Sequence, residues 1–214
     1  MKDKILFGET DIRIRGAVSL ETGRDATYEF ELLAESFHHT ANVAVEALAK
    51  DERFESMGWG SVSFRAFPIV FLYRQALELL IKGIIVAGAP MVESDGGDVD
   101  MGVVYSEHNF EKLRPMVEKV MEAMGFGWDF NIPQLRSLKD FRRLLAEFDQ
   151  FDPTSTVCRY PVDGGGNPAM EDARCFNLFR FAETMDSILE ALAIAPGAIS
   201  ATVDQYFSYL QEMS

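Results

Sequence analysis

The sequence is poor in cysteine, histidine and positive charge. Its 214 residues include 2 Cys, 3 His and 20 Lys or Arg against 34 Asp or Glu, for a formal net charge of −14. Cys158 and Cys175 are too few for a disulfide framework and lack zinc-ligand spacing, so we expect neither a metal nor a cofactor. Phosphate binding needs clustered Lys and Arg, so the acidic balance excludes a broad duplex nucleic-acid surface. It still allows one small anion site.

An uncharged apolar run of membrane length is also missing. The most apolar stretch, residues 67–89, contains Arg74, Glu78 and Lys82. Each such charge would cost about 2.5–3.5 kcal/mol in a bilayer, so we interpret the stretch as a buried helix. The N-terminus lacks the apolar segment of a secretory signal. We therefore predict a cytoplasmic protein with no membrane partner.

The sequence does contain strong helical periodicity. Apolar residues recur at three- and four-residue spacing, which predicts helices over 27–49, 65–87, 109–124, 133–151, 169–193 and 199–212. Gly88 with Pro90 and Pro196 with Gly197 are expected to end the second and fifth helices. The predicted fold is all-α: a single helical-bundle domain over 23–214, with four longer helices and a short C-terminal helix. An extended N-terminal arm over 1–22 could form a short hairpin.

The second predicted helix has one unusual feature. Arg74, Glu78 and Lys82 follow one another at four-residue intervals in an otherwise apolar sequence. Four residues advance about 400° around a helix, so the three side chains share one narrow row. Buried charges need partners. The row therefore forms a surface ridge or closed ion network, or it lines a polar cleft that binds an anion.

Three segments resemble the HEPN superfamily, helical domains of prokaryotic toxin, defence and nucleotide-binding proteins. They are residues 73–82 (YRQALELLIK), 108–113 (HNFEKL) and 151–161 (FDPTSTVCRYP), and the resemblance covers roughly residues 65–195. It implies a HEPN-like bundle, dimerisation and association with a nucleotide or RNA. Many members are metal-independent ribonucleases with an Arg-x4–6-His motif. The present sequence lacks that motif, so it resembles a divergent member of the superfamily.

Two further places are candidates for a ligand site. His108 opens the third predicted helix, where it could cap the helix, act as an acid or base, or contact an anion. Arg159 and Tyr160 lie in a loop, where Arg159 could bind a phosphate or carboxylate, or pin the loop to a carboxylate. The proposed ligand-binding set is Arg74, Glu78, Lys82, His108, Arg159 and Tyr160, and the catalytic candidates are His108 and Arg159.

Three functions remain open at this point. The first is a dimeric binding or regulatory protein whose polar cleft takes a nucleotide, an RNA end or a protein partner. The second is a divergent metal-independent ribonuclease of a toxin–antitoxin or antiviral system, with Arg159 on the phosphate and His108 moving the proton. The third is a structural dimerisation module with no ligand.

Overall fold

The structure is a computed structural model that describes residues 23, 25–56, 58–152, 155–170 and 175–213. The described part contains helices and no strand, so the all-α prediction is confirmed. The predicted arm over 1–22 lies outside the described residues. The helices are α1 (Ala26–Ala49), the short 3-10 helix η1 (Phe54–Ser56), α2 (Trp59–Ser94), α3 (Met101–Ser106), α4 (Phe110–Ala123), α5 (Leu138–Phe151), α6 (Leu178–Ala193) and α7 (Ala195–Met213).

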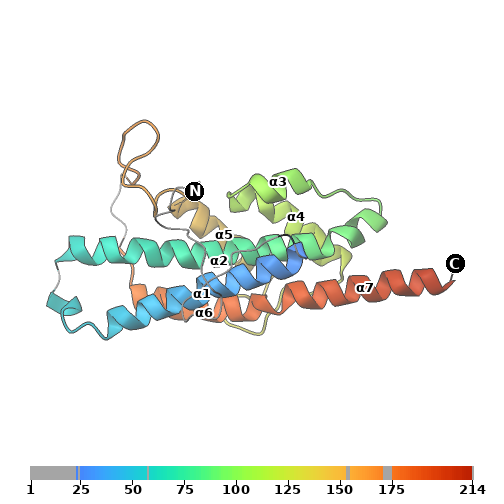
Figure 1. Cartoon of the computed structure of the whole chain (residues 1–214), viewed down its shortest axis with the longest axis horizontal. Coiled ribbons are helices and arrows are strands. Elements are labelled where there is room, and N and C mark those ends of the chain that lie inside the picture. The colour runs from blue at the N-terminus through green and yellow to red at the C-terminus, as the bar shows by residue number, and fades with distance from the viewer. Residues whose placement is uncertain (1–22, 24, 57, 153–154, 171–174, 214) are drawn as a thin grey trace, which may run out of the picture.

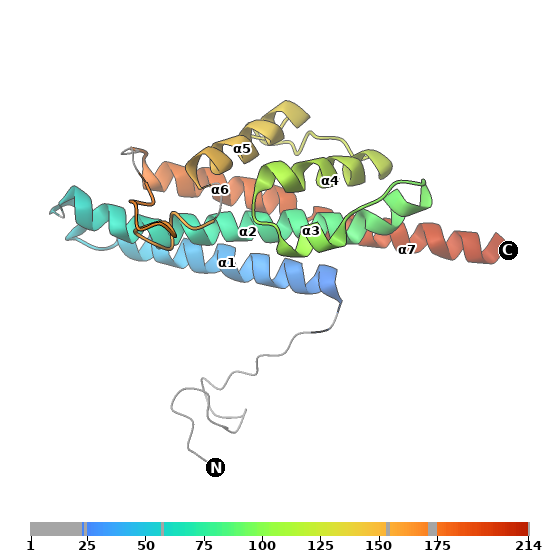
Figure 2. The ribbon, with the colours of Figure 1, turned by 90° about the horizontal axis from the view of Figure 1, so that it is seen from above.

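Helix α2 is the centre of the bundle. It contacts α1, α3, α4, α6 and α7. α1 runs antiparallel beside it, and α6 is followed almost end to end by α7 (Figure 1). Seen from above, α1 lies on one side of α2, and α4 and α5 lie on the other (Figure 2). Because neighbours cover α2 on several sides, a nearly all-apolar sequence is stable there.

The α1–α2 pair is packed along a seven-residue repeat. The buried residues of α1 are Thr27, Ala34, Ala41 and Leu48, each seven positions after the last. Phe30 and Phe37 lie between them and pack against the same core. Small residues in such a seam let two helices approach closely, and a repeat of this period is typical of helices that cross at a shallow angle.

The predicted boundaries of α2 are wrong at both ends. The helix has 36 residues and continues through Gly88 and Pro90, which were expected to end it. A Cβ atom on Gly88 would overlap the Val120 side chain of α4 and crowd Ile199 of α7. Gly88 is therefore a point of close helix packing, which a sequence pattern does not distinguish from a helix stop.

The C-terminal helix is longer than predicted. α7 has 19 residues because Pro196 falls in its first turn, where a missing N–H costs no hydrogen bond. Its end projects beyond the other helices (Figure 1) and exposes Tyr209, Leu210 and Met213. By length and composition alone, residues 178–213 could cross a membrane, with 33% of the most apolar window buried. One such helix is weak evidence for a membrane span.

Smaller corrections concern the connections. α6 begins at Leu178, after the Asn177 cap, and not near residue 169. α5 begins after the Ser137 cap, later than predicted. The stretch between the second and third predicted helices contains the end of α2 and all of α3. Asn109, the first residue of the third predicted helix, is the N-cap of α4, so the expectation that His108 caps this helix is wrong.

Candidate functional site

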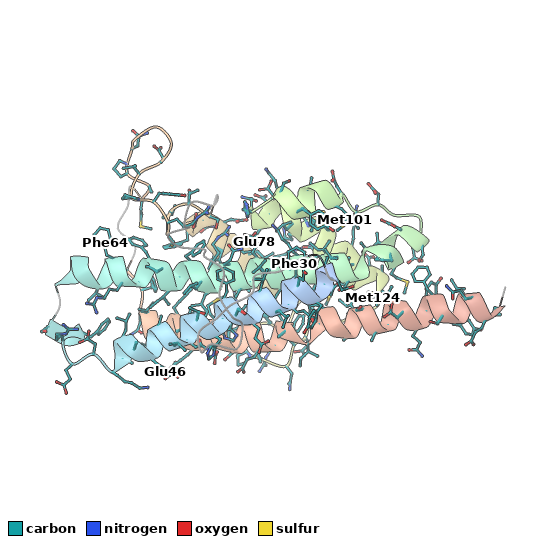
Figure 3. The ribbon with its side chains drawn as sticks, viewed as in Figure 1. Phe30, Glu46, Phe64, Glu78, Met101 and Met124 are labelled. Carbon is teal, nitrogen blue, oxygen red and sulfur yellow. The ribbon has the colours of Figure 1, made fainter. Side chains whose placement is uncertain are left out.

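The charged row of α2 is buried and forms one connected network. The Glu78 carboxylate accepts from Arg74 Nη1 at 3.0 Å and from Lys82 Nζ at 3.0 Å. The side chains of Arg74, Glu78 and Lys82 are 0%, 1% and 4% exposed. Glu78 lies midway along α2, inside the bundle (Figure 3). The surface ridge is thus excluded, and the row does not itself line an open cleft.

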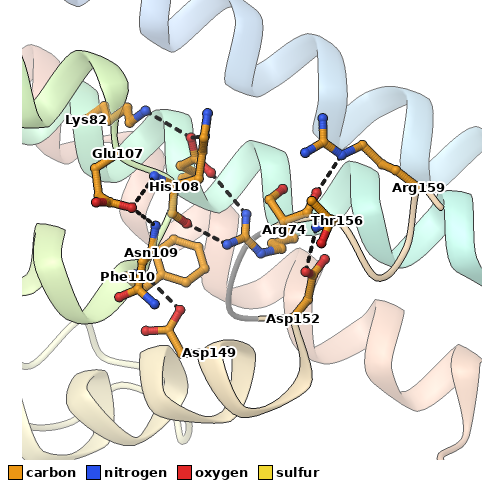
Figure 4. Close-up of polar contacts among 12 residues, drawn as sticks. Arg74, Lys82, Glu107, His108, Asn109, Phe110, Asp149, Asp152, Thr156 and Arg159 are labelled. Carbon is orange, nitrogen blue, oxygen red and sulfur yellow. Dashed lines mark hydrogen bonds and ion pairs between the residues drawn. The ribbon is translucent and has the colours of Figure 1, made fainter. Parts of the chain in front are cut away.

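Residues outside α2 complete the network (Figure 4). Arg74 Nη2 donates to the His108 carbonyl at 2.6 Å, and the Arg74 guanidinium lies 4.7 Å from the centre of the Phe110 ring. These contacts tie the start of α4 to the centre of α2. A buried guanidinium needs hydrogen bonds and favours an aromatic face, so this packing offsets part of its desolvation cost.

His108 is the part of the network that reaches solvent. Its Nδ1 lies 2.8 Å from Glu78 Oε1, while 51% of the side chain is exposed. A carboxylate only accepts hydrogen bonds, so the proton of this contact lies on Nδ1. Nε2 is the ring nitrogen that does not contact Glu78. A buried carboxylate that orients an exposed imidazole is an arrangement suited to proton transfer.

Acidic groups surround the start of α4 below His108. The Glu107 carboxylate accepts from the backbone N–H groups of His108 and Asn109 and pairs with Lys112 Nζ at 2.6 Å. These bonds, chiefly that from Lys112, lower the pKa of Glu107 to about 2. Asp149 of α5 accepts from the first N–H groups of α4, while burial raises its pKa above the ordinary value. The helix terminus is therefore already occupied by the chain's own carboxylates.

Arg159 lies on the loop after α5 and makes no bond to the row. Its Nε donates to the Ser155 carbonyl, and its guanidinium lies 5.5 Å from the Phe71 ring and 5.7 Å from the Tyr160 ring. Among the described residues it pairs with no carboxylate. The predicted pinning of the loop by a pair between Arg159 and a carboxylate is therefore wrong for the described residues. Asp152 holds the loop in another way, because it accepts from the backbone N–H groups of Thr156 and Val157.

The Arg159 loop borders a cavity of about 390 Å³. We call it the Arg159 cavity. Its described lining is largely aromatic and apolar, with Arg159 as the charged group: Phe64, Phe67, Pro68, Val157, Cys158, Arg159, Tyr160, Pro161, Ala169 and Met170. Tyr160 is 56% exposed and Phe64 is 70% exposed. Burial raises the pKa of the Cys158 thiol to about 12, so this cysteine is a protonated wall of the cavity and not a nucleophile.

The structure divides the predicted set of site residues into two groups. Arg74, Glu78, Lys82 and His108 form the network, and Arg159 and Tyr160 border the cavity. No residue of the network lines the Arg159 cavity.

A second polar network was not foreseen from the sequence. Asn42 of α1 accepts from the Tyr73 hydroxyl of α2 and donates to Asp186 of α6 at 2.7 Å. His38 is also within 2.6 Å of Asp186. Burial raises the pKa of Tyr73 to about 12. The contacts of this network between different helices join residues that are 31 to 148 positions apart in sequence, so no local pattern could indicate them.

Across the described residues, no group of three or more His, Cys, Asp or Glu side chains is placed to hold a metal ion. Comparisons of the chain with protein-family models, with curated proteins and with solved structures gave no match.

Proposed function

We propose that the protein is a HEPN-like binding or regulatory module that holds an anionic ligand in the Arg159 cavity. The observation that carries this proposal is Arg159 itself. In a chain with a net charge of −14, it is an exposed cation without a carboxylate partner among the described residues. Charge-assisted hydrogen bonds from Arg to phosphate or carboxylate are among the strongest polar contacts.

The walls of the cavity favour a ligand that also has a flat apolar part. Phe64 and Phe67 lie with their ring centres 6.1 Å apart, and Tyr160 stands beside the guanidinium. Aromatic side chains of this kind stack on bases at about 1–3 kcal/mol each. A volume of about 390 Å³ lies in the range of small-molecule sites. A nucleotide or an RNA end meets both requirements, and a protein partner with an acidic and aromatic segment is the alternative ligand.

Calorimetric titration with adenosine monophosphate and with a short single-stranded RNA tests this proposal. Arg159→Ala should weaken binding at least about tenfold, because a hydrogen bond to a charged group contributes about 1.5–3 kcal/mol. Tyr160→Ala should weaken it by a similar or smaller factor. Arg136→Ala is the matched control, since Arg136 is exposed and is not one of the residues that line the cavity. Binding that is unchanged in Arg159→Ala, or absent in the wild type, would refute the proposal.

A second candidate function rests on His108. Its imidazole is oriented by Glu78 and open to solvent, as an acid or base in a divergent ribonuclease would have to be. An RNA-cleavage assay of the wild type and His108→Ala decides this candidate. Cleavage that disappears in His108→Ala supports it, and absence of cleavage in both removes it.

We also propose that the protein acts as a homodimer in the cytoplasm, in a toxin–antitoxin or antiviral setting. The support is the apolar end of α7, where Tyr209, Leu210 and Met213 are exposed. Sedimentation equilibrium should give twice the mass of one chain, and Leu210→Glu should shift the equilibrium towards monomer. A single-chain mass at high concentration would contradict dimerisation.

A further inference from the structure

We propose that Asp152 is a positioning residue for Arg159. It holds the Arg159 guanidinium so that both Nη groups, and not Nε, bind an anion with two terminal oxygens, either a phosphate or a carboxylate. This inference rests on the proposed anion site for its ligand. The claim that Asp152 holds the loop and thereby positions Arg159 can be tested without any ligand.

Asp152 is the buried anchor of the loop. It is 0% exposed, and its backbone N–H ends α5 by donating to the Phe148 carbonyl at 2.7 Å. Its Oδ1 accepts from Thr156 N–H at 2.7 Å and from Val157 N–H at 3.1 Å. One buried carboxylate oxygen therefore holds two successive backbone N–H groups, four and five positions further along the chain.

The folded loop in turn fixes Arg159. The Thr156 carbonyl, beside the N–H that Asp152 holds, accepts from Arg159 N–H at 3.0 Å and from Tyr160 N–H at 2.9 Å. Ser155 has a φ of 58°, in the left-handed region that costs a serine free energy. This conformation places the Ser155 carbonyl where it accepts from Arg159 Nε. The two hydrogen bonds from Thr156 and Val157 to Asp152 offset part of that cost.

The use of Nε determines how Arg159 can meet a ligand. A guanidinium binds a two-oxygen anion either side-on, through Nε and one Nη, or end-on, through both Nη groups. Because Ser155 accepts from Nε, the end-on edge is the one available. The rings of Phe71 and Tyr160 limit rotation of the guanidinium. Lysine has one nitrogen and cannot replace this planar pair of donors.

Two substitutions of Asp152 test whether its Oδ1 acceptor holds the loop. Asp152→Asn keeps an oxygen at the Oδ1 position, and the second oxygen it replaces has no hydrogen-bond partner in the described structure. Asp152→Ala removes the acceptor for both Thr156 and Val157. The inference therefore requires that Asn preserves the loop and that Ala does not.

The first experiment is independent of any ligand. In proton–nitrogen spectra, Arg159 Nε–H should give a resonance protected from solvent exchange, identified by its loss in Arg159→Lys. The signal should persist in Asp152→Asn and lose its protection in Asp152→Ala, with urea unfolding confirming that both variants are folded. A protected signal in Asp152→Ala would overturn the positioning role. If Asp152→Ala does not fold, Thr156→Pro is used as the test variant, because it removes the N–H that Asp152 holds. The Arg159 Nε–H signal should then lose its protection in Thr156→Pro.

The second experiment measures binding of inorganic phosphate and of acetate by titration calorimetry. We expect Asp152→Ala, Arg159→Ala and Arg159→Lys each to weaken binding by about tenfold or more, and Asp152→Asn to bind like the wild type. The double variant of Asp152→Ala and Arg159→Ala should lose no more than Arg159→Ala alone, because Asp152 acts only through Arg159. Comparison of the two affinities shows whether Arg159 prefers a phosphate or a carboxylate. Additive losses would overturn the inference. If the wild type binds neither anion, the anion site itself is refuted, and the exchange experiment still decides the role of Asp152.

Discussion

Replacement of Glu78 by alanine is the most direct test of the network at the centre of the bundle. The substitution removes the one carboxylate that Arg74 and Lys82 share, at 3.0 Å from each. The two cations remain on α2, packed among Leu77, Ile81 and other buried apolar residues. Arg74 keeps its bond to the His108 carbonyl, whereas Lys82 loses its ion pair with Glu78.

The expected loss of stability follows from this geometry. Removal of one partner of a buried ion pair costs about 3–5 kcal/mol, because the other charge stays desolvated. Two buried cations lose their counter-ion here, so we expect a value near the upper end, about 4–5 kcal/mol. The contact with His108 adds little, because that side chain is 51% exposed and solvent screens it. Such a loss is about a quarter or more of the roughly 5–15 kcal/mol that stabilises an ordinary domain.

Urea unfolding followed by circular dichroism measures the change. Glu147→Ala is the matched control, because that side chain is 71% exposed and lies 4.0 Å from Arg143; it should cost no more than about 1 kcal/mol. Replacing the whole row with Arg74→Met, Glu78→Leu and Lys82→Met should cost less than Glu78→Ala alone, since no charge is then stranded. A loss below about 0.5 kcal/mol for Glu78→Ala, a value typical of exposed pairs, would refute the idea that the network is buried and unhydrated.

Three further outcomes follow from the structure. Gly88→Ala should cost about 1–3 kcal/mol through overpacking, whereas Gly83→Ala, with its nearest neighbour at 3.4 Å, should be neutral or stabilising; equal effects in urea unfolding would contradict the packing role. Ellman's reagent at pH 8 should label the exposed Cys175 rapidly, and Cys158, whose pKa burial raises to about 12, only after unfolding; two fast thiols would refute this. Because the pKa of Glu107 falls from 4.5 to about 2 in the fold, its contribution is complete above pH 4.5 and declines towards pH 2. Glu107→Gln should therefore flatten the acid dependence of unfolding in that window, and an unchanged slope would contradict the shift.

The sequence predicted the fold class and most helices because periodicity and caps are local signals. The apolar face of α4 and its Asn109 cap are both encoded within a few residues. Gly88 and Pro90 misled the prediction of α2 because the reason for that glycine is Val120, 32 positions later in the chain. Tertiary packing overrides local propensity at such positions.

The candidate site was predictable to a smaller extent. The spacing of Arg74, Glu78 and Lys82 indicates a shared row, since helix geometry alone fixes it. The same spacing does not reveal that the row is buried, because burial depends on α4 and α6 being placed around α2. Arg159 was expected to join the row, but its Nε is taken by a backbone carbonyl, which carries no signature in side-chain chemistry.

The polar link among α1, α2 and α6 has a consequence for how the chain assembles. α1 and α2 are consecutive, so their seam closes at a small loop-entropy cost and should form early. The Asp186 contacts with His38 and Asn42 bridge 148 and 144 residues and require α6, so they should form last. Pulse-labelled hydrogen exchange should then protect α1 and α2 before α6. The order of protection would make Asp186 a marker of completed folding, whose substitution speeds unfolding more than it slows refolding.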